Sequence, residues 1–250
     1  MKNKEQEEIH DLIPGKVKII QNDKYFKFGT DSVLLANFSR VYEDDLVVDF
    51  GAGSGVIPFL LAHKKKPDKI IGLEIQPELV ALAERNVNLN NLENLIEIRE
   101  ADFREASKLF SAGSIDLVVS NPPYLKIDGG RISKNRHLAI ARHELYGSVK
   151  DVLREANYLL RIGGILSLVH RSERLPEILS LLSNYNLEAK RLRLVYPRIH
   201  YSADRFLLEV RKGGGPGLEV EPPLIVYRGK DQEYTEEVQQ MYGAENYDKK

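Results

Sequence analysis

The chain has 250 residues, of which 42% are hydrophobic and 29% are charged, and its formal net charge is -1. These fractions are ordinary for a globular protein with a sizeable core, and they exclude extensive disorder and fibrous repeats. A net charge near zero excludes binding of nucleic acid through bulk charge, so any nucleic-acid site must be local.

The composition also constrains the compartment and the cofactors. The first eight residues carry charges of both signs and lack the apolar stretch of a secretory signal. No apolar run approaches the roughly 20 residues that cross a bilayer. With 0 Cys, disulfides, thiolate catalysis and zinc ribbons are excluded, and we expect a cytoplasmic protein. The 6 His show no i, i+4 pairing, so we expect no metal site.

Short apolar runs alternate with amphipathic segments along most of the chain, which indicates strands alternating with helices. We predict strands at 46–50, 69–74, 95–99, 115–120, 165–170, 189–196 and 206–211. We predict helices at 31–38, 57–62, 77–91, 149–160 and 173–184, with Gly163 and Gly164 stopping the helix at 149–160. This alternation predicts an open, doubly wound α/β domain whose parallel sheet is covered on both faces.

Changes in composition suggest three regions. Residues 1–40 form an N-terminal extension with β character at 16–28, and residues 41–212 form the main α/β domain. A glycine-rich break begins at Gly213, and beyond it lie only one short apolar run and a polar helix near 234–241. We therefore interpret residues 213–250 as a linker and an appended tail.

A glycine-rich turn follows the first strand of the main domain. Its glycines, Gly51, Gly53 and Gly55, have the spacing G-x-G-x-G, and Asp49 precedes them. Val56 breaks the dinucleotide spacing G-x-G-x-x-G, so the pattern favours S-adenosylmethionine (AdoMet), whose cationic groups suit acidic surroundings. A tight strand-to-helix turn without a ligand is the alternative.

Acidic residues follow the next strands at the edge where ligands of open α/β sheets bind. Glu74 ends the strand about 20 residues after the glycines, a distance at which an acid accepts hydrogen bonds from ribose hydroxyls. Asp102 and Phe103 follow the strand at 95–99, and Asp102 is a candidate acceptor for the adenine amine. Capping of local backbone is the alternative for both acids.

The segment Asn121, Pro122, Pro123 and Tyr124 follows the strand at 115–120. An exocyclic amine or an amide nitrogen is a poor nucleophile because its lone pair is delocalised. If the Asn121 side-chain oxygen and the Pro122 carbonyl each accept one N–H, that lone pair is localised, and the prolines pre-organise both acceptors. Tyr124 would stack on a planar base. The alternative is a proline-stiffened turn.

With both motifs, the chain resembles class I AdoMet-dependent methyltransferases that carry Asn-Pro-Pro-Tyr, specifically the bacterial tRNA adenine-N6 methyltransferases that act on valine tRNA beside the anticodon. The resemblance covers roughly 24–211 and includes the segment 25–36. It implies a Rossmann-like, seven-stranded, mostly parallel sheet whose last strand is antiparallel. It also implies that Phe28, Thr30 and Asp31 lie close to AdoMet, with helix capping as the alternative for Thr30 and Asp31.

Two locally basic segments are candidates for tRNA binding, because phosphate contacts beside aromatic side chains suit RNA. A solvated charged face is the alternative. The candidate arginines are Arg136 and Arg142 after the acceptor motif, and Arg191, Arg193 and Arg198 near the end of the sheet.

The acceptor motif alone leaves other acceptors open. Protein glutamine-N5 methyltransferases and ribosomal RNA guanine-N2 methyltransferases carry the same tetrapeptide. Only about 45 residues precede the first cofactor strand, which is short for the N-terminal helical domain of the glutamine enzymes. A non-catalytic RNA-binding protein on this scaffold would be expected to lose the motif or the acids, and both are present. The sequence therefore favours adenine.

Overall fold

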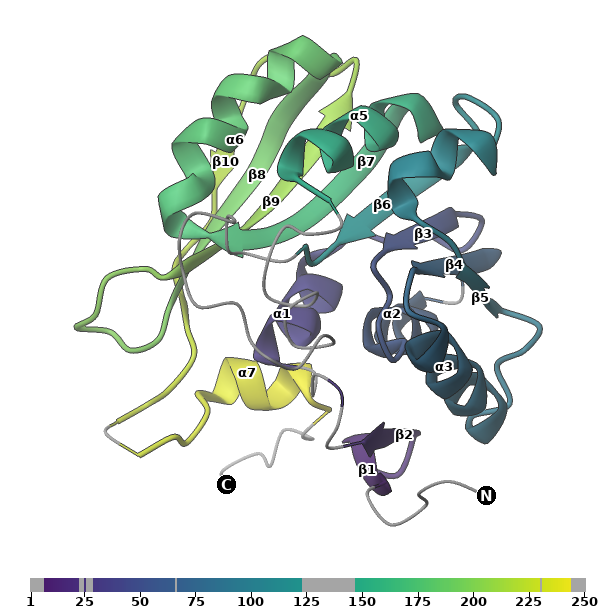
Figure 1. The fold of residues 1–250 in the computed structure, drawn as a ribbon. Coiled ribbons are helices and arrows are strands. Elements are labelled where there is room, and N and C mark those ends of the chain that lie inside the picture. The colour runs from purple at the N-terminus through teal and green to yellow at the C-terminus, as the bar shows by residue number, and fades with distance from the viewer. Residues whose placement is uncertain are drawn as a thin grey trace, which may run out of the picture.

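A nine-stranded sheet forms the centre of the protein (Figure 1). The computed structural model describes residues 7–22, 25, 29–65, 67–122, 147–229 and 231–243. The strand order is β10-β8-β9-β7-β6-β3-β4-β5, and β11 also pairs with β8. The strands are β3 (Leu46–Phe50), β4 (Lys69–Glu74), β5 (Ile96–Glu100), β6 (Ile115–Ser120), β7 (Leu160–Arg171), β8 (Leu187–Tyr196), β9 (Arg205–Lys212), β10 (Glu219–Val220) and β11 (Leu224–Ile225).

Strand direction confirms the predicted class I methyltransferase sheet. Strands β3 to β7 pair in parallel, and β9, the last of the seven long strands, is antiparallel to both β7 and β8. The short strands β10 and β11 extend this sheet beyond the predicted seven strands. Strand β3 pairs with β4 on one side and β6 on the other, so the order of the strands reverses beside it.

Helices cover both faces of the sheet. One core contains residues of α1, α2, α3 and α7, and the other contains residues of α5 and α6. None of the helices in the described ranges is long and apolar enough to span a membrane. The helices are α1 (Thr30–Phe38), α2 (Val56–Lys65), α3 (Pro77–Leu89), α5 (Val149–Leu159), α6 (Leu175–Leu182) and α7 (Glu236–Met241).

The expected stop at Gly163 and Gly164 is wrong. Helix α5 ends at Leu159, and both glycines lie inside β7. Gly163 has φ +82°, and the pairing of β6 with β7 shifts register in this stretch, which is the behaviour of a bulge. A Cβ atom on Gly164 would lie 2.9 Å from the Arg161 carbonyl oxygen. The glycines therefore permit close backbone contact within a strand.

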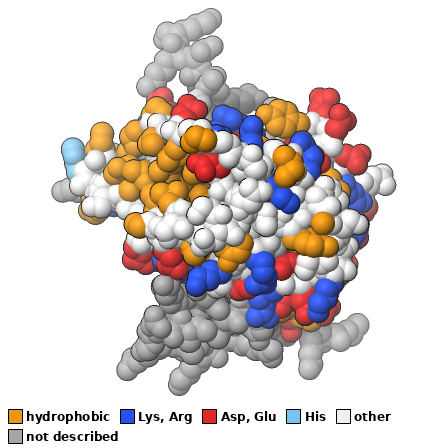
Figure 2. Space-filling view, turned by 90° about the horizontal axis from the view of Figure 1, so that it is seen from above, with side chains coloured by type: hydrophobic (Ala, Val, Ile, Leu, Met, Phe, Trp, Pro, Cys, Tyr) orange, Lys and Arg blue, Asp and Glu red, His pale blue; other side chains and the backbone are white. Residues whose placement is uncertain are grey.

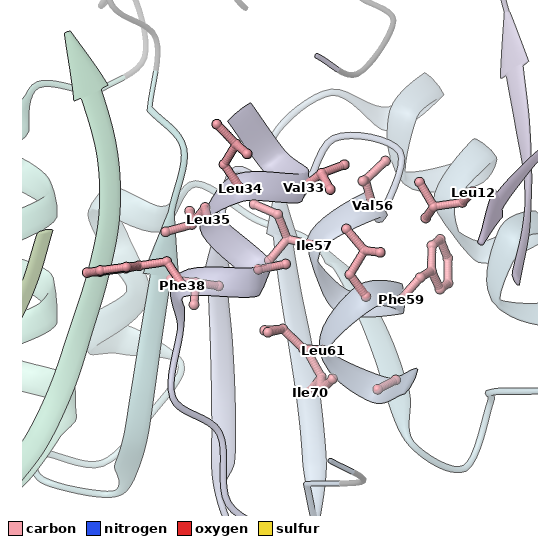
Figure 3. Packing of buried hydrophobic residues seen from close by; sticks show 14 of the residues in the cluster. Leu12, Val33, Leu34, Leu35, Phe38, Val56, Ile57, Phe59, Leu61 and Ile70 are labelled. Atoms are coloured by element: carbon pink, nitrogen blue, oxygen red, sulfur yellow. The ribbon is translucent and has the colours of Figure 1, made fainter. Parts of the chain in front are cut away.

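Helix α1 packs into the core beside α2 (Figure 3). Val33, Leu34 and Leu35 are fully buried, and Val56 and Ile57 of α2 belong to the same cluster. Residues of α1 also contact β7, β9 and α7. Helix α1, which lies within the residues 1–40 expected to form an extension, is therefore part of the main core.

A hairpin of β1 (Glu7–Ile13) and β2 (Val17–Asn22) packs against α3. Asn86 of α3 and Asn90, the residue that caps the C-terminal end of α3, bind the β2 backbone as a neighbouring strand would. Asn86 Oδ1 accepts from Ile20 N–H at 2.7 Å, and Asn90 Oδ1 accepts from Lys18 N–H at 2.9 Å. Their amide nitrogens donate to the carbonyls of the same two residues. Side chains thus satisfy backbone groups that the two-stranded hairpin leaves unpaired.

The segment after Gly217 is part of the main domain, which corrects its interpretation as an appendage. Strands β10 and β11 pair in parallel with β8. Leu224, Val226 and Val238 are fully buried in the core that contains α1 and α2. In Figure 1, α7 lies beside α1. Apolar residues that are sparse in sequence can therefore still complete a core.

We predict that Leu224→Ala lowers the free energy of unfolding by about 2–4 kcal/mol, because it leaves a cavity in the core. Val220→Ala, at a 61% exposed position in the same segment, is the control and should cost below about 0.5 kcal/mol. Urea denaturation measures both values. Equal effects of the two variants would show that the segment does not support the core.

Candidate active site

A glycine and two polar residues lie at the carboxyl ends of three neighbouring parallel strands. Phe50 of β3 is in register with Leu73 of β4 and with Ser120 of β6. The next positions, Gly51, Glu74 and Asn121, therefore occupy one row at the edge of the sheet, with adjacent strands roughly 4.8 Å apart. This edge, beside the reversal in strand order, is where open α/β sheets bind ligands.

Strand alternation directs the polar side chains to one face. Val47, Ile70 and Val119 belong to the core under α1 and α2. Because successive side chains alternate across a strand, Asp49 and Glu74 project to that same face. Asn121, two positions after Val119, reaches the N-terminal turn of α1 there, since its Nδ2 donates to Ser32 Oγ at 3.2 Å. The glycine turn, Asp49, Glu74 and Asn121 thus converge on one side of the sheet.

The glycine turn has the backbone that its sequence predicts. Gly51, Gly53 and Gly55 have φ values of +81°, +57° and +91°, which L side chains rarely adopt. No heavy atom of another part of the described chain lies within 4 Å of a Cβ built on Gly51 or Gly53. On Gly55 that Cβ would lie 2.8 Å from the Phe59 ring. The first two glycines therefore face open space, whereas Gly55 permits close packing on α2.

Glu74 is tied to the glycine turn. Its Oε2 accepts a hydrogen bond from Gly53 N–H at 2.9 Å, and its Oε1 accepts one from Gln76 N–H at 3.0 Å. Burial raises the pKa of Glu74, and the two backbone N–H groups oppose that rise. A carboxylate can accept further hydrogen bonds, so these contacts fix its orientation and leave capacity for a ligand hydroxyl.

Asp49 is fully buried, and neither of its oxygens has a hydrogen-bond partner in the described part of the chain. Burial, and secondly the nearby charge of Glu74, raise the pKa of Asp49 to about 8. An unpaired buried carboxyl group destabilises a fold unless something compensates it. A cationic ligand above the glycine turn would provide that compensation.

Asp102 caps the segment after β5, as expected from the capping alternative to its role as an acceptor for the adenine amine. It accepts from Arg104 N–H at 2.9 Å and forms an ion pair with the Arg104 side chain. Phe103 stacks on Phe50 with ring centroids 5.2 Å apart. A Cβ on Gly147 would lie 2.2 Å from the Phe103 ring, so Gly147 permits that ring to occupy its position.

The first turn of α1 is held by side chains from distant elements. Thr30 Oγ1 hydrogen-bonds Tyr234 Oη at 3.0 Å, and Asp31 pairs with Arg205 of β9. Pro122 is buried. Phe28, Pro123, Tyr124, Arg136 and Arg142 lie outside the described residues, so their predicted contacts remain predictions.

The comparison with known families identifies the fold and the chemistry together. The model of the family "Methyltransferase small domain" matches residues 23–190. The chain belongs to this family. It is an AdoMet-dependent methyltransferase, and the glycine turn with its buried acids fits that cofactor: open space above the backbone and an unpaired carboxyl suit a cationic ligand.

Two curated relatives of this methyltransferase carry the same name. The tRNA1(Val) (adenine(37)-N6)-methyltransferase of Aeromonas salmonicida is 31% identical over 75% of this chain and 77% of its own length. The protein of that name from Porphyromonas gingivalis (strain ATCC 33277) is 30% identical over 74% of each chain.

Solved structures show the same fold. A predicted O-methyltransferase from Agrobacterium tumefaciens superposes with a TM-score of 0.68 at 24% identity, covering 85% of this chain and 95% of the other. The tRNA m1G37 methyltransferase of M. jannaschii superposes with a TM-score of 0.60 at 17% identity, covering 86% of this chain and 59% of the other.

The basic segment 190–198, in and just after β8, holds the C-terminal part of the methyltransferase. Arg191 is 9% exposed, stacks on Phe38 and pairs with the fully buried Glu209 at 2.6 Å. These contacts favour a structural role for Arg191 over the expected RNA contact. Further contacts join this segment to residues after Gly213: Lys190 with Gly215 O at 2.5 Å, Arg191 with Glu221 at 2.6 Å, Arg193 with Pro222 O at 3.0 Å and Arg198 with Gly229 O at 2.5 Å.

Surface charge agrees with the near-zero net charge. On the face in Figure 2, acidic and basic side chains are interspersed, and the described residues form no continuous basic area there. Arg198 lies over the rings of Tyr201 and Tyr227, at 5.5 and 5.7 Å from their centroids, and Tyr201 is exposed. This aromatic pairing keeps Arg198 as the β8-side candidate for RNA contact.

Sequence reasoning missed several residues that support the site. Asn86 Nδ2 donates to the Ser54 carbonyl of the glycine turn at 3.2 Å, and Asn86 is fully buried. Ser32 contacts Asn121, and Tyr234 contacts Thr30. The position of Asn86 on the apolar face of the helix predicted at 77–91 could have indicated a buried polar role. No local pattern marks Ser32 or Tyr234, because their partners lie far away in the chain.

We predict that Asp49→Asn removes a pH-dependent loss of stability in the ligand-free protein. With a pKa raised to about 8, folded Asp49 keeps a proton that the unfolded chain releases near its ordinary pKa of about 4. The contribution of Asp49 to the free energy of unfolding is therefore fully present below about pH 4. It is lost as pH rises toward 8, at up to roughly 1.4 kcal/mol per pH unit.

Denaturation from pH 5 to 9 measures this difference. The unfolding free energy of the wild type should fall relative to that of Asp49→Asn as pH rises. Asp68→Asn, at an exposed position, is the control and should follow the wild type. Parallel pH profiles of wild type and Asp49→Asn would contradict the buried, protonated carboxyl.

We also predict that Arg191→Ala lowers the free energy of unfolding by about 3–5 kcal/mol, because it leaves Glu209 buried without its cation. Arg228→Ala removes a surface ion pair with Glu236 and should cost below about 1 kcal/mol. Chemical denaturation measures both. A loss of tRNA affinity in Arg191→Ala at unchanged stability would restore the RNA-contact interpretation.

Proposed function

We propose that this enzyme transfers a methyl group to the exocyclic N6 of an adenine in tRNA, in the anticodon loop of valine tRNA. The observation that carries the proposal is the position of Asn121 and Pro122. They leave the end of β6 beside the glycine turn of β3, on the face where Asp49 and Glu74 project. The names of the curated relatives support adenine and tRNA.

The cofactor site would be formed by residues from three strand ends. AdoMet, when bound, supplies an electrophilic methyl group on a sulfonium. Gly51 and Gly53 would admit it to the backbone, and Glu74 would accept hydrogen bonds from ribose hydroxyls. Asp49 would balance its positive charge, and Asp102 would accept from the adenine amine. Phe28, Thr30, Asp31, Gly55 and Phe103 would line or support this site.

The acceptor amine would be activated by orientation. Asn121 Oδ1 and the Pro122 carbonyl would each accept one N–H of the amine, which localises the nitrogen lone pair toward the methyl group. Tyr124 would stack on the base with Pro123 beside it, and such stacking is worth about 1–3 kcal/mol per base. The amine is neutral when it attacks, so its extra proton leaves after methyl transfer and no general base is needed beforehand.

The tRNA would be held by the segment after the acceptor motif and by the β8–β9 connection. Arg136 and Arg142 supply positive charge on the first side. Arg198 with exposed Tyr201 supplies a cation and an aromatic surface on the second, a combination that suits phosphate and an unstacked base. Arg193 contributes only if its contact with Glu237 at 2.7 Å is exchanged for phosphate.

Methyl transfer to purified tRNA tests the proposal. Wild-type enzyme with labelled AdoMet should produce N6-methyladenosine, which mass spectrometry of nucleosides distinguishes from N2-methylguanosine. Mass spectrometry of tryptic peptides would detect methylglutamine, the product of the alternative protein substrate. We predict that Asn121→Ala lowers kcat about 100-fold or more while AdoMet affinity changes little, because the side chain acts on the transition state.

Asn184→Ala is the matched control and should keep wild-type kcat, because Asn184 is exposed and does not follow the carboxyl end of β3, β4 or β6. Wild-type turnover by Asn121→Ala would remove the orienting role. Methylguanosine or methylglutamine as the sole product would replace adenine as the acceptor.

A further inference from the structure

The first turn of α1 is a rigid support next to the acceptor motif. Tyr234 from the C-terminal segment holds Thr30, and Arg205 from β9 holds Asp31. Behind this turn, Val33, Leu34 and Leu35 are fully buried against α2 (Figure 3). A side chain on this turn therefore has a fixed position relative to the sheet.

Ser32 lies on that turn, is 9% exposed, and contacts the motif directly. Its Oγ accepts a hydrogen bond from Asn121 Nδ2 at 3.2 Å. The two residues are 89 positions apart in the chain, and the contact joins the N-terminal helix to the end of β6.

The chemistry of an amide makes this contact consequential. An asparagine side chain has an acceptor end and a donor end of nearly the same shape, and only the acceptor end can receive an N–H from a substrate amine. With the amide reversed, N–H groups would face N–H groups and the amine would be repelled. Ser32 Oγ accepts from Nδ2 in this structure, so the contact stabilises the orientation in which Nδ2, and not Oδ1, faces α1.

We propose that Ser32 is a positioning residue that orients the Asn121 amide for the methyl acceptor. The inference rests on the proposed function, because it assigns Asn121 the role of receiving an amine N–H. Ser32 acts through Asn121 and does not touch the substrate. Thr30, Asp31 and their partners Tyr234 and Arg205 keep Ser32 in place, which links the C-terminal segment to the acceptor motif.

A kinetic cycle tests the coupling. Ser32→Ala should lower kcat about five- to tenfold, the fold-change for one lost hydrogen bond, with AdoMet affinity unchanged. In an Asn121→Ala background the same substitution should change the residual single-turnover rate less than twofold, since the amide it orients is gone. Ser32→Thr keeps the hydroxyl and should recover most of the rate.

Ser39→Ala is the matched control. Ser39 is on the turn after α1, is buried, and donates to the Leu35 carbonyl at 2.8 Å. A general effect of losing a buried hydroxyl would lower the rate in both variants. An equal loss in the wild-type and Asn121→Ala backgrounds, or wild-type kcat in Ser32→Ala, would overturn the proposal.

The side-chain amide signals of Asn121 in ¹⁵N-labelled protein provide a test that needs no substrate. Ser32→Ala should shift the two Asn121 amide protons, whereas Ser39→Ala should leave them in place. Unshifted signals in Ser32→Ala would refute the contact. If the wild type does not methylate tRNA, the proposed function fails in the kinetic arm, and these signals still decide the role of Ser32 in orienting the amide.

Discussion

The alignment of three parallel strand ends is the constraint on which the rest of the site depends. Phe50, Leu73 and Ser120 are in register, so the residues that follow them share one edge of the sheet. Backbone hydrogen bonds fix this register, and the alternation of side chains then fixes which face each residue uses. The glycine turn and Asn121 are neighbours because β3 and β6 are neighbours.

The site carries an energetic cost that its surroundings offset. Asp49 is buried without a partner among the described residues, beside a second buried acid, Glu74. Burying such groups destabilises the folded state. The extensive hydrophobic cores on both faces of the sheet offset that destabilisation. A buried carboxyl group that lacks a partner among the described residues favours a cationic ligand, so the same feature connects stability to binding.

The C-terminal segment contributes to this arrangement from a distance. Its strands complete the edge of the sheet beside β8, and basic side chains of β8 hold its backbone and acids. Tyr234 then reaches the first turn of α1. A segment outside the matched range 23–190 thereby supports the helix that contacts Asn121. Contacts from the C-terminal segment and from β9 thus hold the turn of α1 that carries Ser32.

The amino-acid sequence determined the order of strands and helices, the glycine turn and the polar residues after each strand, because these follow from local periodicity and spacing. It did not determine the bulge at Gly163, the burial of Leu224 or the role of Arg191. Each depends on partners far away in the chain: β6 for the bulge, the core of α1 and α2 for Leu224, and Glu209 with Glu221 for Arg191. Tertiary packing decided these three features, because the contacts of a basic or apolar residue with distant partners form only when the chain folds.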